Sequence, residues 1–234
     1  LIDGVLPAGV MNVITGGQAC GEALVAHDLI PKVTLIGSIP TGKAIARGAA
    51  ERLKHVSLEL GGKNALILYP DADVPRAIAG AVAGMCFTWC GQACSSTTRL
   101  FVHESIYDEV VAGVVEGVKA FRPGIPTDME TTMGAIVSKA QYDKIMSYIE
   151  LGKAEGAKLV AGGKHPDGAH LANGFFIEPT VFADATMKMR IAQEEIFGPV
   201  LSIIKWSEED AMFEDVNNVE YGLAAGIYTT NLAT

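Results

Sequence analysis

Three cysteines spaced four residues apart, and the residues around the last of them, could do nucleophilic chemistry. On a helix Cys86, Cys90 and Cys94 would share one face. Cys86 and Cys90 lie in an apolar stretch, where cysteines usually pack as small hydrophobic residues. Cys94 follows Gly-Gln-Ala and precedes Ser-Ser-Thr-Thr, and such a glycine-containing break beyond a helix end can expose a thiol and favour its thiolate. Cys94 is therefore a candidate nucleophile, with a structural role as the alternative.

The cysteine spacing does not predict a metal centre. The pattern C-x-x-x-C-x-x-x-C differs by one residue from the iron–sulfur pattern of radical enzymes. Zinc sites usually have C-x-x-C pairs or nearby histidines, and this stretch has neither. We expect no metal ligands here.

A carboxylate inside an apolar run is the second candidate. Glu59 lies in the stretch Leu-Glu-Leu-Gly-Gly-Lys, residues 58–63, at the end of an expected strand. It could be an outward-facing strand residue. It could also be a general base, because a carboxylate partly removed from water has a raised pKa and can accept a proton near neutrality. The two glycines would leave room for a ligand.

Two further stretches could bind a ligand or form ordinary turns. Glu194 and Glu195 precede Ile-Phe-Gly-Pro-Val, which is either a solvated helix end before a turn or part of a site. Residues 37–43 nearly match the phosphate-binding loop of nucleotide hydrolases, with an apolar run before and a helical pattern after. Ala44 stands where that loop needs a hydroxyl for magnesium, and we find no convincing strand-end Asp. A nucleotide hydrolase stays the alternative function.

The elements that must position these residues alternate along the chain. This order predicts an α/β architecture with mainly parallel sheets. Gly61 and Gly62 mark the expected domain boundary. The expected strands are 33–36, 56–60, 65–69, 100–103, 175–182, 200–206 and 223–229, and the expected helices are 22–27, 38–53, 73–87, 105–121, 138–155 and 208–216.

Composition excludes several classes of protein. The 234 residues carry a formal net charge of −9, with no basic run, so nucleic acid is not expected as a partner. The longest apolar runs are far too short to span a membrane. Four cysteines among 26 glycines do not suggest a disulfide scaffold, so a reducing cytoplasm is the expected location.

Taken together, the motifs resemble those of the NAD(P)-dependent aldehyde dehydrogenases. The family's glutamate motif is similar to LELGGK, its cysteine motif to GQAC, and its E-E-x-F-G-P-V segment to EEIFGPV. The lead-in to its cofactor site is similar to LPAGVMNV, residues 6–13. Glu59 and Cys94 are separated by 35 positions, close to the family's separation. Four motifs in this order make the resemblance specific.

The resemblance implies a mechanism for the candidate residues. Cys94 would attack an aldehyde carbon to form a thiohemiacetal and then a thioester, with its own backbone N–H stabilising the oxyanion. Glu59 would activate the water that hydrolyses the thioester to a carboxylic acid. Glu195 would hold the nicotinamide ribose hydroxyls, and Phe197 would pack near the nicotinamide ring. A catalytically silent relative is the alternative.

The resemblance also reinterprets the loop at residues 37–43. Gly37, Ser38 and Gly42 match the family's G-S-x-x-x-G turn, where Ser38 would cap the helix and the helix N-terminus would favour a dinucleotide pyrophosphate. Lys43 then becomes an ordinary surface lysine. The remaining expected cofactor contacts are Leu60 and Gly61.

The domain organisation follows from the same resemblance. Residues 1–61 would be the C-terminal part of a Rossmann-like NAD(P)-binding domain, and residues 62–234 most of an α/β catalytic domain whose C-terminal end is missing. The expected cofactor is NAD, with NADP as the alternative, and the expected substrate is a small aldehyde. The full-length protein would be a homodimer or homotetramer. We expect this stretch by itself not to oxidise aldehydes.

Overall fold

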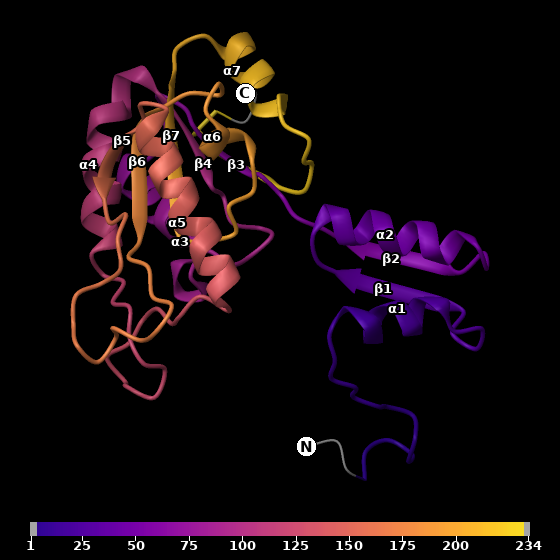
Figure 1. The fold of residues 1–234 in the computed structure, drawn as a ribbon. Helices are drawn as coiled ribbons and strands as arrows, with labels where there is room; N and C mark the ends of the chain where they lie inside the picture. Colours follow the sequence, from indigo (N-terminus) through magenta and orange to yellow (C-terminus); the bar gives the residue numbers. More distant parts are fainter. Residues whose placement is uncertain (1–3, 232–234) are drawn as a thin grey trace. The chain divides into compact units, whose positions relative to one another are not determined.

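The chain forms two compact units in a computed structural model that describes residues 4–231 (Figure 1). Unit 1 comprises residues 1–60, and unit 2 comprises residues 61–234. Residues 1–3 and 232–234, which belong to the predicted domains, lie outside the described residues. The assignment of cofactor binding to one unit and catalysis to the other stays a prediction.

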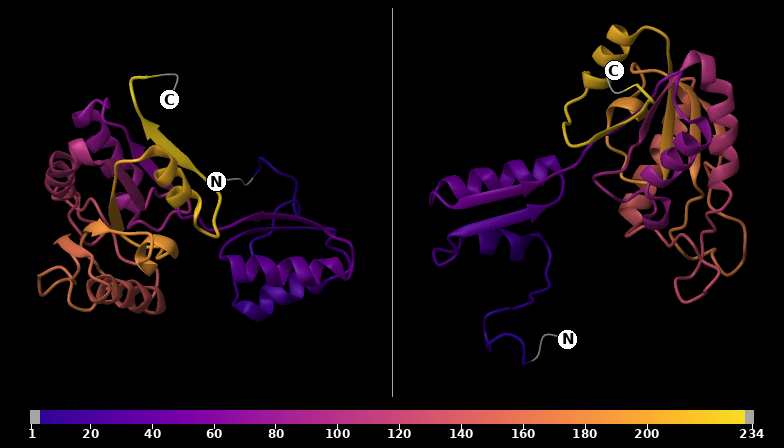
Figure 2. Two further views of the ribbon diagram at one scale, coloured as in Figure 1. Left: turned by 90° about the horizontal axis from the view of Figure 1, so that it is seen from above. Right: turned by 180° about the vertical axis from the view of Figure 1, so that it is seen from behind.

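Unit 1 is built around two parallel strands. Strand β1 (Lys32–Ile36) pairs with β2 (His55–Glu59), and helices α1 (Gln18–Ala26) and α2 (Ile39–Ala50) pack together against one face of the pair (Figure 2). Half-buried positions alternate along β1, as one-sided packing requires. This arrangement is a βαβ unit with a further helix before it.

The helices of unit 1 differ from the predicted ones at their ends. Helix α1 begins at Gln18, four residues before the predicted start, and α2 ends at Ala50. Leu53, the predicted end of α2, has a φ of 49°, which no right-handed helix accommodates. The segment of residues 51–53 is therefore a turn leading into β2.

Unit 2 contains a six-stranded sheet with the order β5-β6-β7-β4-β3-β8. Every neighbouring pair is parallel except β5 and β6, which are antiparallel, so the prediction of a mainly parallel sheet is confirmed. The strands are β3 (Ala65–Leu68), β4 (Arg99–His103), β5 (Lys158–Ala161), β6 (Thr180–Ala185), β7 (Val200–Trp206) and β8 (Ala225–Tyr228).

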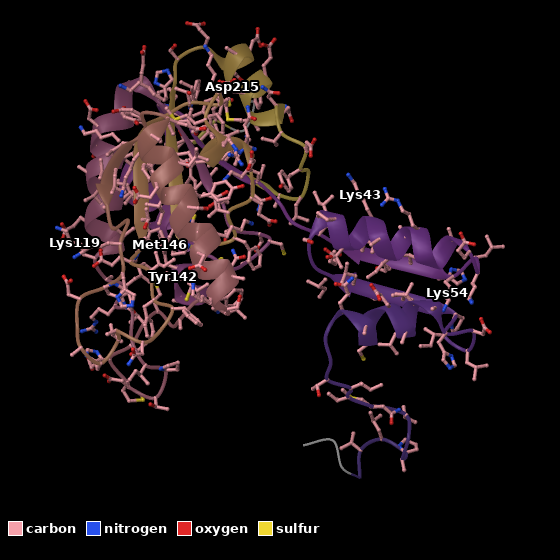
Figure 3. The ribbon with its side chains drawn as sticks, in the orientation of Figure 1. Lys43, Lys54, Lys119, Tyr142, Met146 and Asp215 are labelled. Atoms are coloured by element: carbon pink, nitrogen blue, oxygen red, sulfur yellow. The ribbon has the colours of Figure 1, made fainter. Side chains whose placement is uncertain are left out.

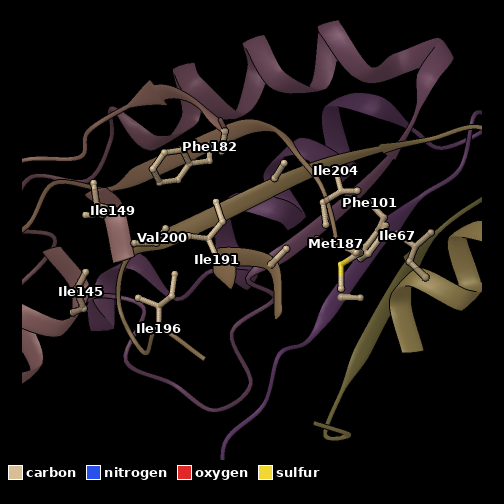
Figure 4. Packing of buried hydrophobic residues seen from close by; sticks show 14 of the residues in the cluster. Ile67, Phe101, Ile145, Ile149, Phe182, Met187, Ile191, Ile196, Val200 and Ile204 are labelled. Carbon is tan, nitrogen blue, oxygen red and sulfur yellow. The ribbon is translucent and has the colours of Figure 1, made fainter. Parts of the chain in front are cut away.

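Successive residues of a strand point to opposite sides of the sheet, and in β3 both sets of side chains are apolar and buried. Helices therefore cover both faces of this sheet. Ile67 packs in a cluster with α5, α6 and α7, which Figure 4 shows together with Phe101 and Phe182. Leu66 and Leu68 pack in a second cluster with α3 and α4. The helices are α3 (Val74–Gly84), α4 (Tyr107–Val118), α5 (Lys139–Ala154), α6 (Arg190–Gln193) and α7 (Glu209–Asn217), with short 3-10 helices η1 (Phe87–Trp89) and η2 (Glu104–Ile106).

Most predicted elements of unit 2 are confirmed, and one is displaced. Strand β7 matches the prediction residue for residue, and Ser138 caps α5 by accepting a hydrogen bond from Gln141 N. The predicted strand 175–182 is wrong over its first half, since pairing with β7 begins at Thr180, after Pro179. Strand β5 and helix α6 were not predicted, because four residues carry too little periodicity to indicate an element.

Candidate active site

The glycine segment at the start of unit 2, Gly61 and Gly62, holds the carboxylate of Glu195. Gly62 N–H donates a hydrogen bond to Glu195 Oε1 at 3.1 Å. A Cβ built on Gly61 would overlap Glu195 Oε2, so this carboxylate fits only because Gly61 has no side chain. The structure thus brings together two predicted site residues, Gly61 and Glu195.

Glu194 and Glu195 have different surroundings despite being neighbours. Glu194 receives two hydrogen bonds from the Arg190 guanidinium at 2.7 and 3.0 Å and a third from Tyr148 Oη. The hydrogen bond from Arg190 is the main reason that the pKa of Glu194 lies below its ordinary value. Glu195 is held through its backbone, where Lys144 Nζ donates to Glu195 O at 2.9 Å. The Glu194 side chain is therefore held by Arg190 and Tyr148, whereas the Glu195 side chain faces Gly61 and Gly62.

Phe197 has a strained backbone that the surrounding contacts maintain. Its φ is 58°, in the left-handed region that non-glycine residues seldom adopt. Gln141 Nε2, on α5, donates to the carbonyl oxygens of Ile196 and Phe197, each at 2.9 Å. Strain of this kind is often found at functional sites. The Phe197 side chain is half-buried.

The cysteine segment is irregular, so its three cysteines do not share a helical face, and the helix predicted over residues 73–87 is shorter than expected. Helix α3 ends at Gly84, and both Cys86 and Cys90 have positive φ, at 53° and 57°. Cys90 is buried, its Sγ donates to Gly134 O at 3.1 Å, and burial raises the pKa of its thiol to about 11. Cys90 is therefore a core residue, as predicted.

Cys94 lies in a tight turn. The turn is closed by the Ser96 N–H, which donates to Ala93 O at 3.1 Å, and the Cys94 side chain is half-buried. Asn64 Nδ2 donates to Cys94 O at 2.7 Å and to Ser96 O at 3.0 Å. A Cβ on Gly62 would lie 2.8 Å from Cys94 O, so the glycine segment also contacts this turn.

The cysteine segment contacts the segment of residues 194–200 as well. Gly91 has a φ of 62°, and a Cβ there would overlap Gly198 O. Within unit 2, the residues following Glu59, the cysteine turn and the EEIFGPV segment therefore meet at one place, although they lie up to about 130 residues apart in sequence.

The other predicted site residues belong to unit 1. Glu59 is the last residue of β2 and pairs with Ile36, and its carbonyl accepts a hydrogen bond from Gly37 N at 3.0 Å. The Glu59 side chain is exposed, so unit 1 by itself does not remove this carboxylate from water. Its predicted role as a base stays a prediction.

The G-S-x-x-x-G turn begins α2 as expected. Ser38 Oγ accepts a hydrogen bond from Thr41 N at 3.4 Å, which caps the helix. Gly42 is buried, and a Cβ there would lie 2.7 Å from Leu60 Cδ2, so Gly42 allows α2 to pack closely on Leu60. Lys43 is exposed and projects from α2, as Figure 3 shows. Phosphate binding at this turn stays a prediction.

Two polar residues of unit 2 were missed by sequence reasoning. Lys63 and Asn64 are each 2% exposed. Both polar atoms of the Asn64 amide have partners, because Oδ1 accepts from Ala224 N at 2.9 Å. Lys63 Nζ has no hydrogen-bond partner among the described residues. Their position directly before the fully buried strand β3 could have indicated that they are buried. However, a lysine after two glycines is also typical of an exposed surface turn.

The environment of Lys63 disfavours its charge. Burial, and to a smaller extent the nearby Arg99 guanidinium, lower the pKa of its ammonium to about 7, against the smaller opposing effect of Glu195 and Glu194. Arg99 is also buried, but it donates to the carbonyl oxygens of Lys63 and Val216 at 2.8 and 3.0 Å. Lys63 is therefore a buried cation whose Nζ, unlike the Arg99 guanidinium, has no hydrogen-bond partner among the described residues.

Replacing Lys63 by Met is expected to stabilise the fold, by about 1–4 kcal/mol near pH 6. Below pH 7 the lysine is charged in both folded and unfolded chains, so the whole cost of burying the ammonium applies. Between pH 7 and 10.5 the folded amine is neutral, so the wild type becomes more stable with rising pH and the advantage of Lys63→Met shrinks. Thermal unfolding at pH 6 and pH 9 measures this difference, with the exposed Lys188→Met as control. A pH-independent gain would contradict the burial argument.

Residues 4–231 contain neither a metal-ligand cluster nor a membrane-spanning helix. No group of three or more His, Cys, Asp or Glu side chains in this range is placed to hold a metal ion. In the same range no helix combines the length and apolar character needed to cross a membrane.

The sequence is similar to known proteins over its whole length. The sequence model of the aldehyde dehydrogenase family matches residues 2–234. The aldehyde dehydrogenase tropH of Talaromyces stipitatus is 52% identical over 238 residues, covering 100% of this chain and 46% of the relative. The betaine aldehyde dehydrogenase of Brucella anthropi is 49% identical over 228 residues, covering 97% and 47%. The chain thus spans about half the length of the curated relatives it matches.

Solved structures are similar to this fold as well. An aldehyde dehydrogenase from Bacillus cereus, solved as an NAD+ complex, aligns with a TM-score of 0.86 at 44% identity, covering 91% of this chain and 42% of the other. A betaine aldehyde dehydrogenase from Staphylococcus aureus, in complex with NAD+, aligns with a TM-score of 0.88 at 37% identity, covering 94% and 44%. Both likenesses extend over nearly all of this chain.

Proposed function

The chain belongs to the aldehyde dehydrogenase family, and on that premise we propose that its protein oxidises an aldehyde to a carboxylic acid with NAD(P)+. The observation that carries this proposal is the meeting of Cys94, Glu195 and the glycine segment in unit 2. A thiol nucleophile beside a cofactor-holding carboxylate is what such an oxidation needs.

The residues around Glu195 fit the ribose of a nicotinamide nucleotide. Glu195 Oε1 accepts the Gly62 N–H, and the carboxylate retains lone pairs that can accept from two neighbouring hydroxyl groups. The space that a Cβ at Gly61 would fill is kept open for this carboxylate. When bound, the nicotinamide supplies the acceptor for the hydride that leaves the substrate carbon. Phe197, in the same segment, would pack against the nicotinamide ring.

Cys94 forms and later breaks the covalent bond to the substrate. Its thiolate attacks the aldehyde carbon, the new C–S bond forms, and the carbonyl oxygen becomes an alkoxide. The Cys94 backbone N–H lies in a closed turn and can donate to that oxygen, which stabilises the thiohemiacetal. Loss of hydride from the same carbon restores the carbonyl as a thioester on Cys94.

Glu59 completes the reaction in this proposal by activating water. The carboxylate takes a proton from water as the oxygen attacks the thioester carbon. The C–S bond then breaks, Cys94 leaves as a thiolate, and the product is the carboxylic acid. Because Glu59 ends strand β2, its backbone is fixed by the parallel pair of unit 1.

An aldehyde panel with both cofactors tests the function. The longer protein, mixed with NAD+ or NADP+ and a series of aldehydes, should produce reduced nicotinamide that absorbs near-ultraviolet light. The relatives' names make betaine aldehyde a first choice for the panel. Absence of reduced nicotinamide with every aldehyde would contradict the proposal. Magnesium-dependent ATP hydrolysis would instead support the P-loop alternative.

Several finer points belong to the same proposal. NAD is the favoured cofactor because the two similar solved structures contain NAD+. The assembled protein is expected to be a homodimer or homotetramer in the cytoplasm, with no nucleic-acid partner, given the net charge of −9. The retained Cys94 and Glu59 argue against a catalytically silent relative.

Replacing Gly61 by Ala is expected to weaken NAD(P)+ binding about tenfold, because the new methyl group displaces the Glu195 carboxylate. That carboxylate is the end of a flexible side chain, so the melting temperature should change little. Titration of protein fluorescence with cofactor measures the affinity. Gly134→Ala is the matched control, since its Cβ would meet nothing within 4 Å. Equal affinities of both variants would contradict this role of Gly61.

A further inference from the structure

Asn64 connects the turn that bears Cys94 to the edge of the sheet in unit 2. The asparagine directly precedes β3, whose two neighbours in the sheet are β4 and β8. Its Nδ2 donates to Cys94 O at 2.7 Å and Ser96 O at 3.0 Å, in the loop that leads into β4. Its Oδ1 accepts from Ala224 N, which directly precedes β8. One buried side chain therefore ties the cysteine turn to three adjacent strands.

These hydrogen bonds give both N–H groups and the oxygen of the amide a partner. An asparagine side chain offers two N–H donors and one carbonyl acceptor, and each has a partner here. The side chain is 2% exposed, so water cannot substitute for it at low cost. Removing it leaves two carbonyl oxygens and one N–H without their partner.

The bond to Cys94 O bears directly on the nucleophile. The Cys94 carbonyl belongs to the central peptide of the turn, so fixing it limits rotation about the Cα–C bond of Cys94. That rotation determines how the thiol and the backbone N–H of Cys94 are oriented relative to the rest of unit 2. Loops without such support vary in position, and misplacement by about 1 Å can cost about a hundredfold in rate.

We propose that Asn64 is a positioning residue for Cys94, which holds the nucleophile's turn in register with the start of strands β3, β4 and β8. Asn64 contacts neither substrate nor cofactor in this role; it acts through the backbone of Cys94. The preceding residues extend the same function, because Gly62 N–H holds Glu195. The segment 61–64 thus sets both the nucleophile and the ribose-binding carboxylate. The effect on turnover rests on the proposed function, whereas the effect on the turn does not.

The test compares Asn64→Ala and Asn64→Ser with Thr98→Val in the full-length protein. Thr98 is a suitable control, since it lies in the same loop, is 8% exposed, and its hydroxyl has no hydrogen-bond partner among the described residues. Asn64→Ser retains one hydroxyl donor and should give an intermediate result, and it replaces Asn64→Ala if that variant does not fold. Amide hydrogen exchange of peptides that cover residues 93–98 reports the turn, and steady-state kinetics report the chemistry.

Asn64→Ala should speed exchange in the turn about tenfold or more, while exchange in β3, β4 and β8 and the affinity for NAD(P)+ stay within twofold of wild type. Its kcat should fall about tenfold or more, with a smaller change in the KM for aldehyde. Unchanged exchange in the turn would overturn the proposal, and so would faster exchange with an unchanged kcat. Exchange can be measured even in a protein that oxidises no aldehyde, so failure of the proposed function would be recognised separately.

Discussion

Replacing Cys94 by Ala in the longer protein is expected to reduce aldehyde oxidation by about 10⁴-fold or more. Without the thiol no thiohemiacetal forms, and no other step of the proposed mechanism can replace that bond. Cofactor binding should persist, because the Glu195 carboxylate is held by Gly62 N–H, and Gly62 lies against the backbone carbonyl of Cys94 rather than its thiol. The measurements are the rate of nicotinamide reduction and the dissociation constant of NAD(P)+.

Cys86→Ala is the matched control for that experiment. Cys86 is also half-buried and lies in the same irregular segment, and its Sγ donates a long hydrogen bond of 3.8 Å to Gly84 O. Its removal should leave the oxidation rate within about threefold of wild type. An active Cys94→Ala variant would refute the nucleophile assignment, whereas loss of activity in Cys86→Ala alone would move the role to that thiol.

The regular part of the fold was predictable because the inner strands of unit 2, β3, β4, β6 and β7, are largely buried on both faces. The apolar run 65–68 and the mostly apolar stretch 200–206 indicate parallel strands covered by helices on each side. The alternation of such runs with helical patterns indicates the α/β class. Only short elements escaped, such as β5 and α6, whose four residues each give no periodic signal.

The irregular backbone of the cysteine segment could not be predicted from its local sequence. Ala81, Ala83 and Met85 are good helix formers and favour continuation of a helix, yet the helix ends at Gly84. The left-handed conformations of Cys86 and Cys90 are maintained by distant contacts, such as Cys90 Sγ with Gly134 O and Gly91 with Gly198. Contacts between residues so far apart in sequence cannot be read from the local pattern.

The sequence indicates the candidate residues Cys94 and Glu195, but it does not indicate that Lys63 and Asn64 are buried beside them. Cys94 and Glu195 have recognisable motifs, whereas Lys63 at the end of LELGGK and Asn64 after it look like ordinary polar residues. Their importance comes from burial at the start of β3, which depends on the neighbouring strands. The sequence alone does not distinguish a buried asparagine whose side chain makes three hydrogen bonds from a buried lysine whose Nζ makes none among the described residues.

Replacing Glu59 by Gln is expected to separate the two halves of the proposed reaction. The first turnover needs Cys94 and cofactor only, so a burst of about one reduced nicotinamide per site should remain. Later turnovers need water attack on the thioester, and loss of the base should slow them by about 10²–10⁴-fold. Stopped-flow absorbance resolves the burst from the slow phase.

The control for Glu59 is Glu51→Gln, an exposed carboxylate of the same unit that follows α2, and its turnover should match wild type. A Glu59→Gln variant without a burst would indicate that Glu59 is needed to deprotonate the thiol of Cys94 as well. Unchanged steady-state turnover would show that another group activates the water. Because Glu59 and Cys94 lie in different units, the burst also reports whether the chemistry of unit 2 proceeds to the thioester without the carboxylate of unit 1.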